Sequence, residues 1–155
     1  MKKLDSLNQV AEFHRTFNAP ILETPQIPSK ERCELRVSLL QEELNELKQA
    51  IEDNDLVEIA DALCDLQYVL SGAVLEFGLG EKFVELFNEV QRSNMSKACD
   101  TELQAQETVE HYKAKGEEAF YEKSGNKFNV HRISDNKVLK NKYYSAADLK
   151  SIIEK

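Results

Sequence analysis

The sequence predicts an all-α fold, a helical bundle followed by a small C-terminal β-hairpin and a short last helix. Three observations lead to this prediction. The chain of 155 residues contains only 5 Gly and 3 Pro, so few residues interrupt helices. Apolar residues recur every three to four positions over much of residues 4–115, which is the spacing of amphipathic helices. Beyond Gly125 the period changes, and short apolar runs separated by turn residues indicate strands.

The first two expected helices follow from this spacing and from residues that favour helix ends. Residues 4–17 have the pattern of a short amphipathic helix. Residues 18–28 contain all three prolines and are expected to form a loop. Ser29 is suited to cap a second helix, which runs to about Asp53.

The next two helices are bounded by similar signals. Asp55, with Glu58 three residues later, has the form of a capping box, so a third helix is expected to begin here. Gly78 is expected to end it. A fourth helix is expected over residues 81–92, followed by a polar loop over residues 93–100.

The last third of the chain gives weaker helical signals. Residues 101–115 form a helical pattern with few apolar contacts. Residues 128–139 are typical of a small hairpin with Asp135 and Asn136 at its turn. Ser145 is expected to start the short last helix.

Composition excludes several classes of protein. The cysteines are odd in number and far apart in the sequence, which favours a reducing, cytoplasmic setting over a disulfide framework. The first residues lack the pattern of a signal peptide, and no run of eighteen apolar residues occurs. We therefore expect a protein that is neither secreted nor embedded in a membrane.

The net charge of −8 is concentrated in one segment. Residues 42–65 hold nine acids against one base, Lys48, so the segment alone carries −8 and the rest of the chain sums to zero. Such a concentration repels nucleic acids and attracts metal cations or basic partners. We expect no nucleic acid partner.

Helical geometry gathers these acids on two facing surfaces. At about 100° per residue, one sector of the second expected helix holds three glutamates. They are Glu42, Glu43 and Glu46. Three acids of the third expected helix, spaced i, i+3 and i+7, lie within roughly 60° of one another. They are Glu58, Asp61 and Asp65. A short turn makes the two helices antiparallel, so that the acidic faces can meet.

The acidic faces suggest a metal site. The third helix is so apolar that it looks buried nearly all round, and unpaired carboxylates buried there would cost several kcal/mol each. Carboxylate oxygens suit Mg²⁺, with Mn²⁺ as a substitute, and favour metal-assisted attack on a phosphoanhydride. The plainer alternative is that the glutamates of the second helix are solvated and that Glu58 only caps a helix.

The motif Glu42-Glu43-Leu-Asn-Glu46, followed after eleven residues by Glu58-Ile-Ala-Asp61, resembles a family signature. It is the EExxE…ExxD pattern of the all-α nucleoside triphosphate pyrophosphohydrolases, which include MazG proteins, dimeric dUTPases and phosphoribosyl-ATP pyrophosphohydrolase. Segments around residues 93–97 and 137–140 are similar to a MazG-like subgroup, so the resemblance extends over about residues 5–150. It implies Mg²⁺-dependent hydrolysis of nucleoside triphosphates to a monophosphate and pyrophosphate, on a helical bundle that dimerises or forms tetramers.

The resemblance also implies roles for individual residues. Glu43, Glu46, Glu58 and Asp61 would be metal ligands, with Glu42 a ligand or a neighbour of one. Glu43 is the favoured glutamate for activating water. Ala60 stands where MazG proteins often have Gly before the last acid of the motif, and Asp65 is a second candidate ligand in the register of Asp61.

Several residues outside the acidic motifs are expected to contact substrate. Asn94 and Lys97 match an NxxK element that would contact phosphate or sugar; alternatively they are a helix cap and a solvated lysine. Lys137 and Lys140 would lean over phosphates, unless they are surface charges. Tyr68 either lines the base pocket or belongs to the core.

The sequence thus predicts a nucleotide pyrophosphohydrolase with a house-cleaning or dUTP-type activity, whose catalytic helical domain spans residues 1–125. Residues 126–155 are expected to be an appendage of that domain. One alternative changes the substrate to phosphoribosyl-ATP, in histidine synthesis. Another is a non-enzymatic acidic bundle that binds metal or a basic partner. The apolar third helix also implies a partner subunit, so a homodimer or tetramer is expected.

Overall fold

The structure is a computed structural model that describes residues 3–155, and the chain divides into two compact units. The first unit is Met1–Phe83 and the second is Val84–Lys155. The predicted organisation, a domain over residues 1–125 with an appendage over residues 126–155, is a different kind of division and stays a prediction. Each unit is described by itself below.

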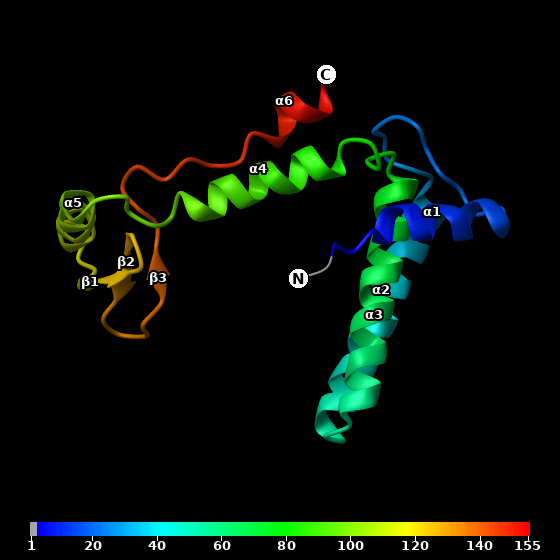
Figure 1. Ribbon diagram of the computed structural model, residues 1–155, viewed down its shortest axis with the longest axis horizontal. Helices are drawn as coiled ribbons and strands as arrows, with labels where there is room; N and C mark the ends of the chain where they lie inside the picture. The colour runs from blue at the N-terminus through cyan, green and yellow to red at the C-terminus, as the bar shows by residue number, and fades with distance from the viewer. Residues whose placement is uncertain (1–2) are drawn as a thin grey trace. The chain divides into compact units, whose positions relative to one another are not determined.

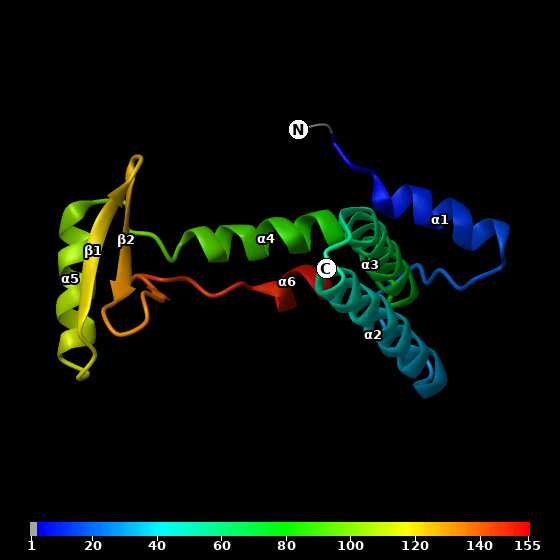
Figure 2. The same ribbon diagram turned by 90° about the horizontal axis from the view of Figure 1, so that it is seen from below.

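The first unit is built on a long antiparallel helical hairpin. Helices α2 (Lys30–Glu52) and α3 (Leu56–Glu76) lie side by side, and α1 (Ser6–Thr16) packs against α3 (Figures 1 and 2). The Ser29 hydroxyl caps α2 by accepting from the Arg32 N–H, as expected. Asn54, with a φ of 54°, makes the tight turn between α2 and α3. The three helices predicted for this part are confirmed.

The start of α3 shows that Glu58 is not needed for capping. The Asp55 carboxylate accepts from the N–H groups of Val57 and Glu58, at 2.9 and 3.2 Å. The N–H of Asp55 donates to Ala50 O at 3.0 Å, so the reciprocal bond of a capping box is not made. The Glu58 carboxylate is therefore available for another role.

Gly78 ends α3, as predicted. It has a φ of +66°, which an L side chain rarely adopts. A Cβ at this position would lie 1.9 Å from the carbonyl oxygen of Thr24, so the loop before α2 also requires glycine here.

An ion cluster that the sequence did not reveal joins the three helices. Glu76 of α3 is 1% exposed and accepts from Arg36 at 2.5 Å and from Arg32. His14 of α1 contacts Arg36 at 3.3 Å through Nε2, while its Nδ1 lies 2.8 Å from the Pro20 carbonyl oxygen. A ring that donates from Nδ1 and accepts at Nε2 satisfies both contacts. His14 and Arg36 therefore have a structural role in this arrangement.

The expectation that the third helix is buried nearly all round is wrong for the chain by itself. The buried residues of α3 are Ala62 and the run at 71–76. Leu63 is 52% exposed, and Leu56 and Leu70 are exposed as well. On α2 the exposed apolar side chains include Val37, Leu44 and Ile51. Two helices and one crossing helix offer too little surface to cover every apolar face.

The second unit combines helices with a small sheet. Its helices are α4 (Phe83–Met95), which starts at the unit boundary, α5 (Glu102–Lys113) and α6 (Leu149–Ile153). Its strands are β1 (Ala119–Ser124), β2 (Lys127–Arg132) and β3 (Val138–Leu139), antiparallel in the order β1-β2-β3. The predicted hairpin is the β2–β3 pair, with Asn136 in the left-handed region at its turn. Strand β1 was not predicted.

The core of this unit lies between α5 and the sheet (Figure 2). Its buried members are Cys99, Ala105, Val130 and Leu139. Cys99 also exchanges two backbone hydrogen bonds with Phe128, at 2.8 and 2.9 Å, which ties the segment after α4 to β2. The sheet packs against α5, which has few apolar residues of its own, as the weak helical pattern of residues 101–115 indicated.

Two predicted boundaries are wrong. Helix α4 continues to Met95, so the loop expected from residue 93 begins later. Helix α6 begins at Leu149 and not at Ser145, because the Ser145 N–H donates to Ser96 Oγ at 3.0 Å and Asp148 makes the cap by accepting from the Ser151 N–H. Among the helices described, none has the length and apolar character needed to cross a membrane.

Candidate active site

Glu43 is the centre of the acidic face between α2 and α3. Burial raises the pKa of its carboxyl, and neighbouring negative charges raise the pKa further. In decreasing order, these charges are Glu46, Asp65, Glu42 and Asp61. Four of the other five predicted acids therefore act on Glu43, and two of them, Asp61 and Asp65, do so from the facing helix α3.

One oxygen of Glu43 lacks a partner. Its Oε2 is buried and has no hydrogen bond within the described residues. A buried carboxylate oxygen without a donor costs free energy unless it is protonated or meets a cation. This is the group on the acidic face that most needs a ligand.

Glu58 joins the site through a depression of about 400 Å³ at the closed end of the hairpin. Glu46 of α2 and Asp61 of α3 line the same depression, together with Asp53 and Asp55. The depression is open to solvent, and Glu46, Glu58 and Asp61 are exposed. Three of the predicted ligands thus share one solvent-accessible hollow.

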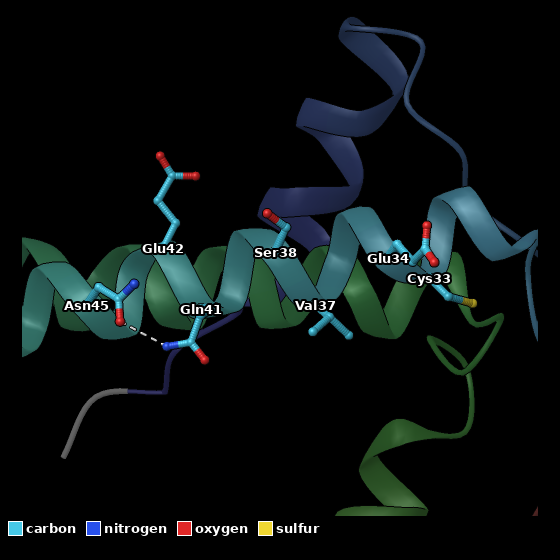
Figure 3. A pocket seen from close by; sticks show the side chains of 7 residues that line it. All are labelled: Cys33, Glu34, Val37, Ser38, Gln41, Glu42 and Asn45. Atoms are coloured by element: carbon cyan, nitrogen blue, oxygen red, sulfur yellow. Dashed lines mark hydrogen bonds between the residues drawn. The ribbon is translucent and has the colours of Figure 1, made fainter.

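Glu42 faces another surface as well. It lines an open groove of about 710 Å³ along α2 whose lining residues all belong to that helix. Figure 3 shows its carboxylate extending away from the helix, while Gln41 bonds to Asn45 at 2.9 Å on the other side. Val37, in the same groove, is 67% exposed. Glu42 is therefore less closely tied to the hollow than Glu46 is.

The acidic face is not a preformed cluster. Within residues 3–155, no three His, Cys, Asp or Glu side chains are grouped closely enough to hold a metal ion. The acids of α3 are exposed, so the expected cost of burying them does not arise in the single chain. Among the six acids, Glu43 is the one with a buried carboxylate oxygen that lacks a hydrogen-bond partner within the described residues.

Tyr68 lies in an exposed aromatic group and not in the core. Its ring meets Phe13 of α1 edge-on at 5.6 Å, and Phe13 lies 4.4 Å from Phe17. All three rings are more than a third exposed. Phe13 and Phe17 fall within the helix predicted over residues 4–17, and their i, i+4 spacing alone brings the two rings together.

Three of the four predicted residues in the second unit lie around Tyr144. Lys97 donates to Asn94 Oδ1 at 2.8 Å, and the Lys140 ammonium lies 4.4 Å from the centre of the Tyr144 ring. The hydrogen bond to Ser93 lowers the pKa of Tyr144, and the charges of Lys140, Lys97 and Arg92 lower it further. Sequence reasoning did not identify Tyr144.

The fourth residue, Lys137, lies at the turn between β2 and β3. Its N–H donates to Asp135 Oδ1 at 3.2 Å, and its side chain is exposed. The structure does not bring it into the group around Tyr144. The surface-charge alternative fits Lys137 better than it fits Lys140.

These features define a helical protein with facing carboxylates on a two-helix hairpin, and comparison identifies the family. Residues 10–94, more than half of the chain, match the phosphoribosyl-ATP pyrophosphohydrolase family, and the chain belongs to this family. The resemblance and the fold class predicted from the sequence are confirmed. The function is accordingly of the nucleotide pyrophosphohydrolase type, hydrolysis of a phosphoanhydride bond.

One relative is similar to this protein along nearly the whole chain. An uncharacterized protein of Acanthamoeba polyphaga mimivirus is 24% identical, and the alignment covers 99% of this chain and 97% of that protein. The family match includes both acidic motifs and Asn94, whereas Lys97 and Lys140 lie beyond it. Most of the second unit therefore lies outside the family match but inside the alignment with the viral protein.

Proposed function

We propose that the protein is a Mg²⁺-dependent nucleoside triphosphate pyrophosphohydrolase that releases pyrophosphate and a nucleoside monophosphate. The observation that carries the proposal is the buried, unpartnered oxygen of Glu43, surrounded by four further acids. Like charges gather at a half-buried site at a cost in free energy, and a cation removes that cost.

The donor set suits Mg²⁺. Carboxylate oxygens are hard ligands. All six candidate ligands are carboxylates, and none is a His or Cys, the residues that favour zinc. Glu46, Glu58 and Asp61 line the hollow and are the proposed ligands, with Glu43, Asp65 and Glu42 as further candidates. Because these side chains are exposed, rotation about their χ angles can bring their oxygens together. Mn²⁺ is expected to substitute.

Each acid would have a distinct part in the reaction. Bound Mg²⁺ would screen the phosphate charge and polarise the phosphoanhydride. Glu43 would accept a proton from the attacking water, and its raised pKa makes it a stronger base than an exposed glutamate. The ligand acids would hold Mg²⁺, which would in turn bind the phosphate oxygens.

The proposed substrates are nucleoside triphosphates, in a house-cleaning or dUTP-type activity. The exposed rings of Tyr68, Phe13 and Phe17 offer a stacking surface for a base in the first unit. The family name favours phosphoribosyl-ATP as the second candidate substrate. A non-enzymatic acidic bundle is the candidate of another class.

One assay separates the three candidates. A panel of nucleoside triphosphates and phosphoribosyl-ATP is incubated with the protein and Mg²⁺, and pyrophosphate release is measured. The proposal predicts release from at least one triphosphate and none in EDTA. Release from phosphoribosyl-ATP alone favours histidine synthesis, and no release from any compound while Mg²⁺ still binds favours the acidic bundle.

We further propose a homodimer or tetramer. The apolar side chains that α2 and α3 leave exposed include Val37, Leu44, Leu63 and Leu70, and monomeric proteins rarely leave large contiguous apolar patches uncovered. Sedimentation at micromolar concentration is expected to show at least twice the chain mass of 17.7 kDa. A clean monomer of 17.7 kDa would contradict this expectation.

A further inference from the structure

The segment after β3 runs back along α4 and places a tyrosine among lysines. The Arg92 guanidinium donates to Ala146 O at 2.9 Å, and the Asp148 N–H donates to Glu89 Oε1 at 2.9 Å. Between these tethers, the Tyr144 hydroxyl lies 3.0 Å from Ser93 Oγ. Ser93 is buried, so the hydroxyl has a fixed position.

Two ammonium groups near Tyr144 lack a carboxylate. Lys97 is held by the neutral amide of Asn94, and Lys140 lies over the Tyr144 ring. Across residues 3–155, no carboxylate oxygen comes within 4.0 Å of either ammonium, whereas Arg92 is paired with Glu89 at 2.7 Å. Positive charge here is therefore not neutralised by the protein.

The neighbouring tyrosine provides a contrast. Lys142 lies 5.4 Å from the Tyr143 ring centre, much as Lys140 lies over Tyr144. The Tyr143 hydroxyl, however, donates to Glu107 at 2.6 Å, and Glu107 also lies 4.0 Å from Lys142. One lysine–tyrosine pair is neutralised by an acid and the other is not.

We propose that Tyr144, together with Lys97 and Lys140, forms a site of the second unit that binds a phosphoryl group. When Ser93 donates to the phenol oxygen, the Tyr144 O–H is free to donate to an anion. Two ammonium groups and a hydroxyl match the acceptors of a phosphate. The hydrogen bond to Ser93 is the main cause of the lowered pKa of Tyr144, and the charges of Lys140 and Lys97 add to it. Identifying the phosphate as part of a nucleotide rests on the proposed function.

Isothermal titration of the full chain with inorganic pyrophosphate in EDTA tests the proposal. Without divalent cations the acids of α2 and α3 repel pyrophosphate, so binding in EDTA reports a basic site. Tyr144→Phe keeps the ring and removes the hydroxyl, and is expected to weaken binding about three- to tenfold. Lys140→Gln is expected to weaken it by a similar factor and to reduce the dependence on salt.

Tyr143→Phe and Lys142→Gln are the matched controls and should bind pyrophosphate within about twofold of the wild type. The proposal is overturned if the wild type binds no pyrophosphate at millimolar concentration, or if Tyr144→Phe binds as tightly as Tyr143→Phe. If Tyr144→Phe melts early, Lys140→Gln decides, because its side chain is exposed. Binding in EDTA without hydrolysis in Mg²⁺ would contradict the proposed function and leave the anion site standing.

Discussion

The α2–α3 hairpin contains two glutamates with buried carboxylate oxygens that differ in what surrounds them. Glu76 meets Arg36 and Arg32, whose hydrogen bonds and charges lower its pKa although burial alone would raise it. Glu43 meets only further acids, and its pKa is raised. The comparison teaches that a buried charge serves the fold when the protein supplies its counter-ion, and points to a ligand when the protein does not.

Removing Glu76 should have the largest effect on stability. Glu76→Gln leaves two arginines without a carboxylate, one of them only 8% exposed, and breaking a buried ion pair from one side costs about 3–5 kcal/mol. The free energy of unfolding in urea measures this loss. Glu34→Gln, which removes only a surface pair with Lys30 at 3.5 Å, should change stability by less than about 1 kcal/mol. Equal effects of the two variants would show that the cluster at Glu76 contributes no special stability.

Magnesium should stabilise the wild type by an intermediate amount. A cation that binds only the folded state at a hundred times its Kd adds about 2.7 kcal/mol. Thermal melts with and without millimolar Mg²⁺ measure the shift. Glu43→Gln should lose most of this shift and Glu76→Gln should keep it. No shift in the wild type, with no heat in a calorimetric titration, would contradict the metal site.

Neutralising Glu43 should have the smallest effect on stability and the opposite sign. Without metal, Glu43→Gln removes a repelled, unpartnered charge and should stabilise the fold by about 1 kcal/mol at neutral pH. Because the folded pKa of Glu43 is raised, this gain should vanish as pH falls through that pKa towards the ordinary value of 4.5. The contribution of Glu76 runs the other way, since its pKa is lowered: it is present above 4.5 and is lost as pH falls through the folded pKa. Urea midpoints between pH 3 and 8 test both signs, and a destabilised Glu43→Gln at pH 7 would contradict the comparison.

Local patterns in the sequence predicted the helices and the acidic face well. Apolar spacing and the caps at Ser29 and Asp55 determine α2 and α3, and helical geometry alone places Glu43 near Asp61 and Asp65. These features depend on residues that are close in sequence. The spacing of residues in the sequence was therefore enough to predict the two helices and the acidic face.

Features that depend on distant residues were not predicted. Arg36 and Glu76 are 40 residues apart, and Ser93 and Tyr144 are 51 apart, so no local pattern links them. Strand β1 has the burial pattern of a mostly exposed strand, and its pairing with β2 gives it its structure. Composition also could not distinguish an apolar face covered within the chain from one left exposed, which is why α3 was expected to be buried.

The most direct test of the central claim is the activity of Glu43→Gln on the best nucleotide found in the panel. The substitution keeps size and removes charge and basicity, so pyrophosphate release should fall by about 10² or more. Glu52→Gln is the matched control, because Glu52 is exposed on the same helix and pairs with Lys48 at 3.8 Å; its activity should stay within a few-fold of wild type. A folded Glu43→Gln that releases pyrophosphate as fast as wild type would contradict the account.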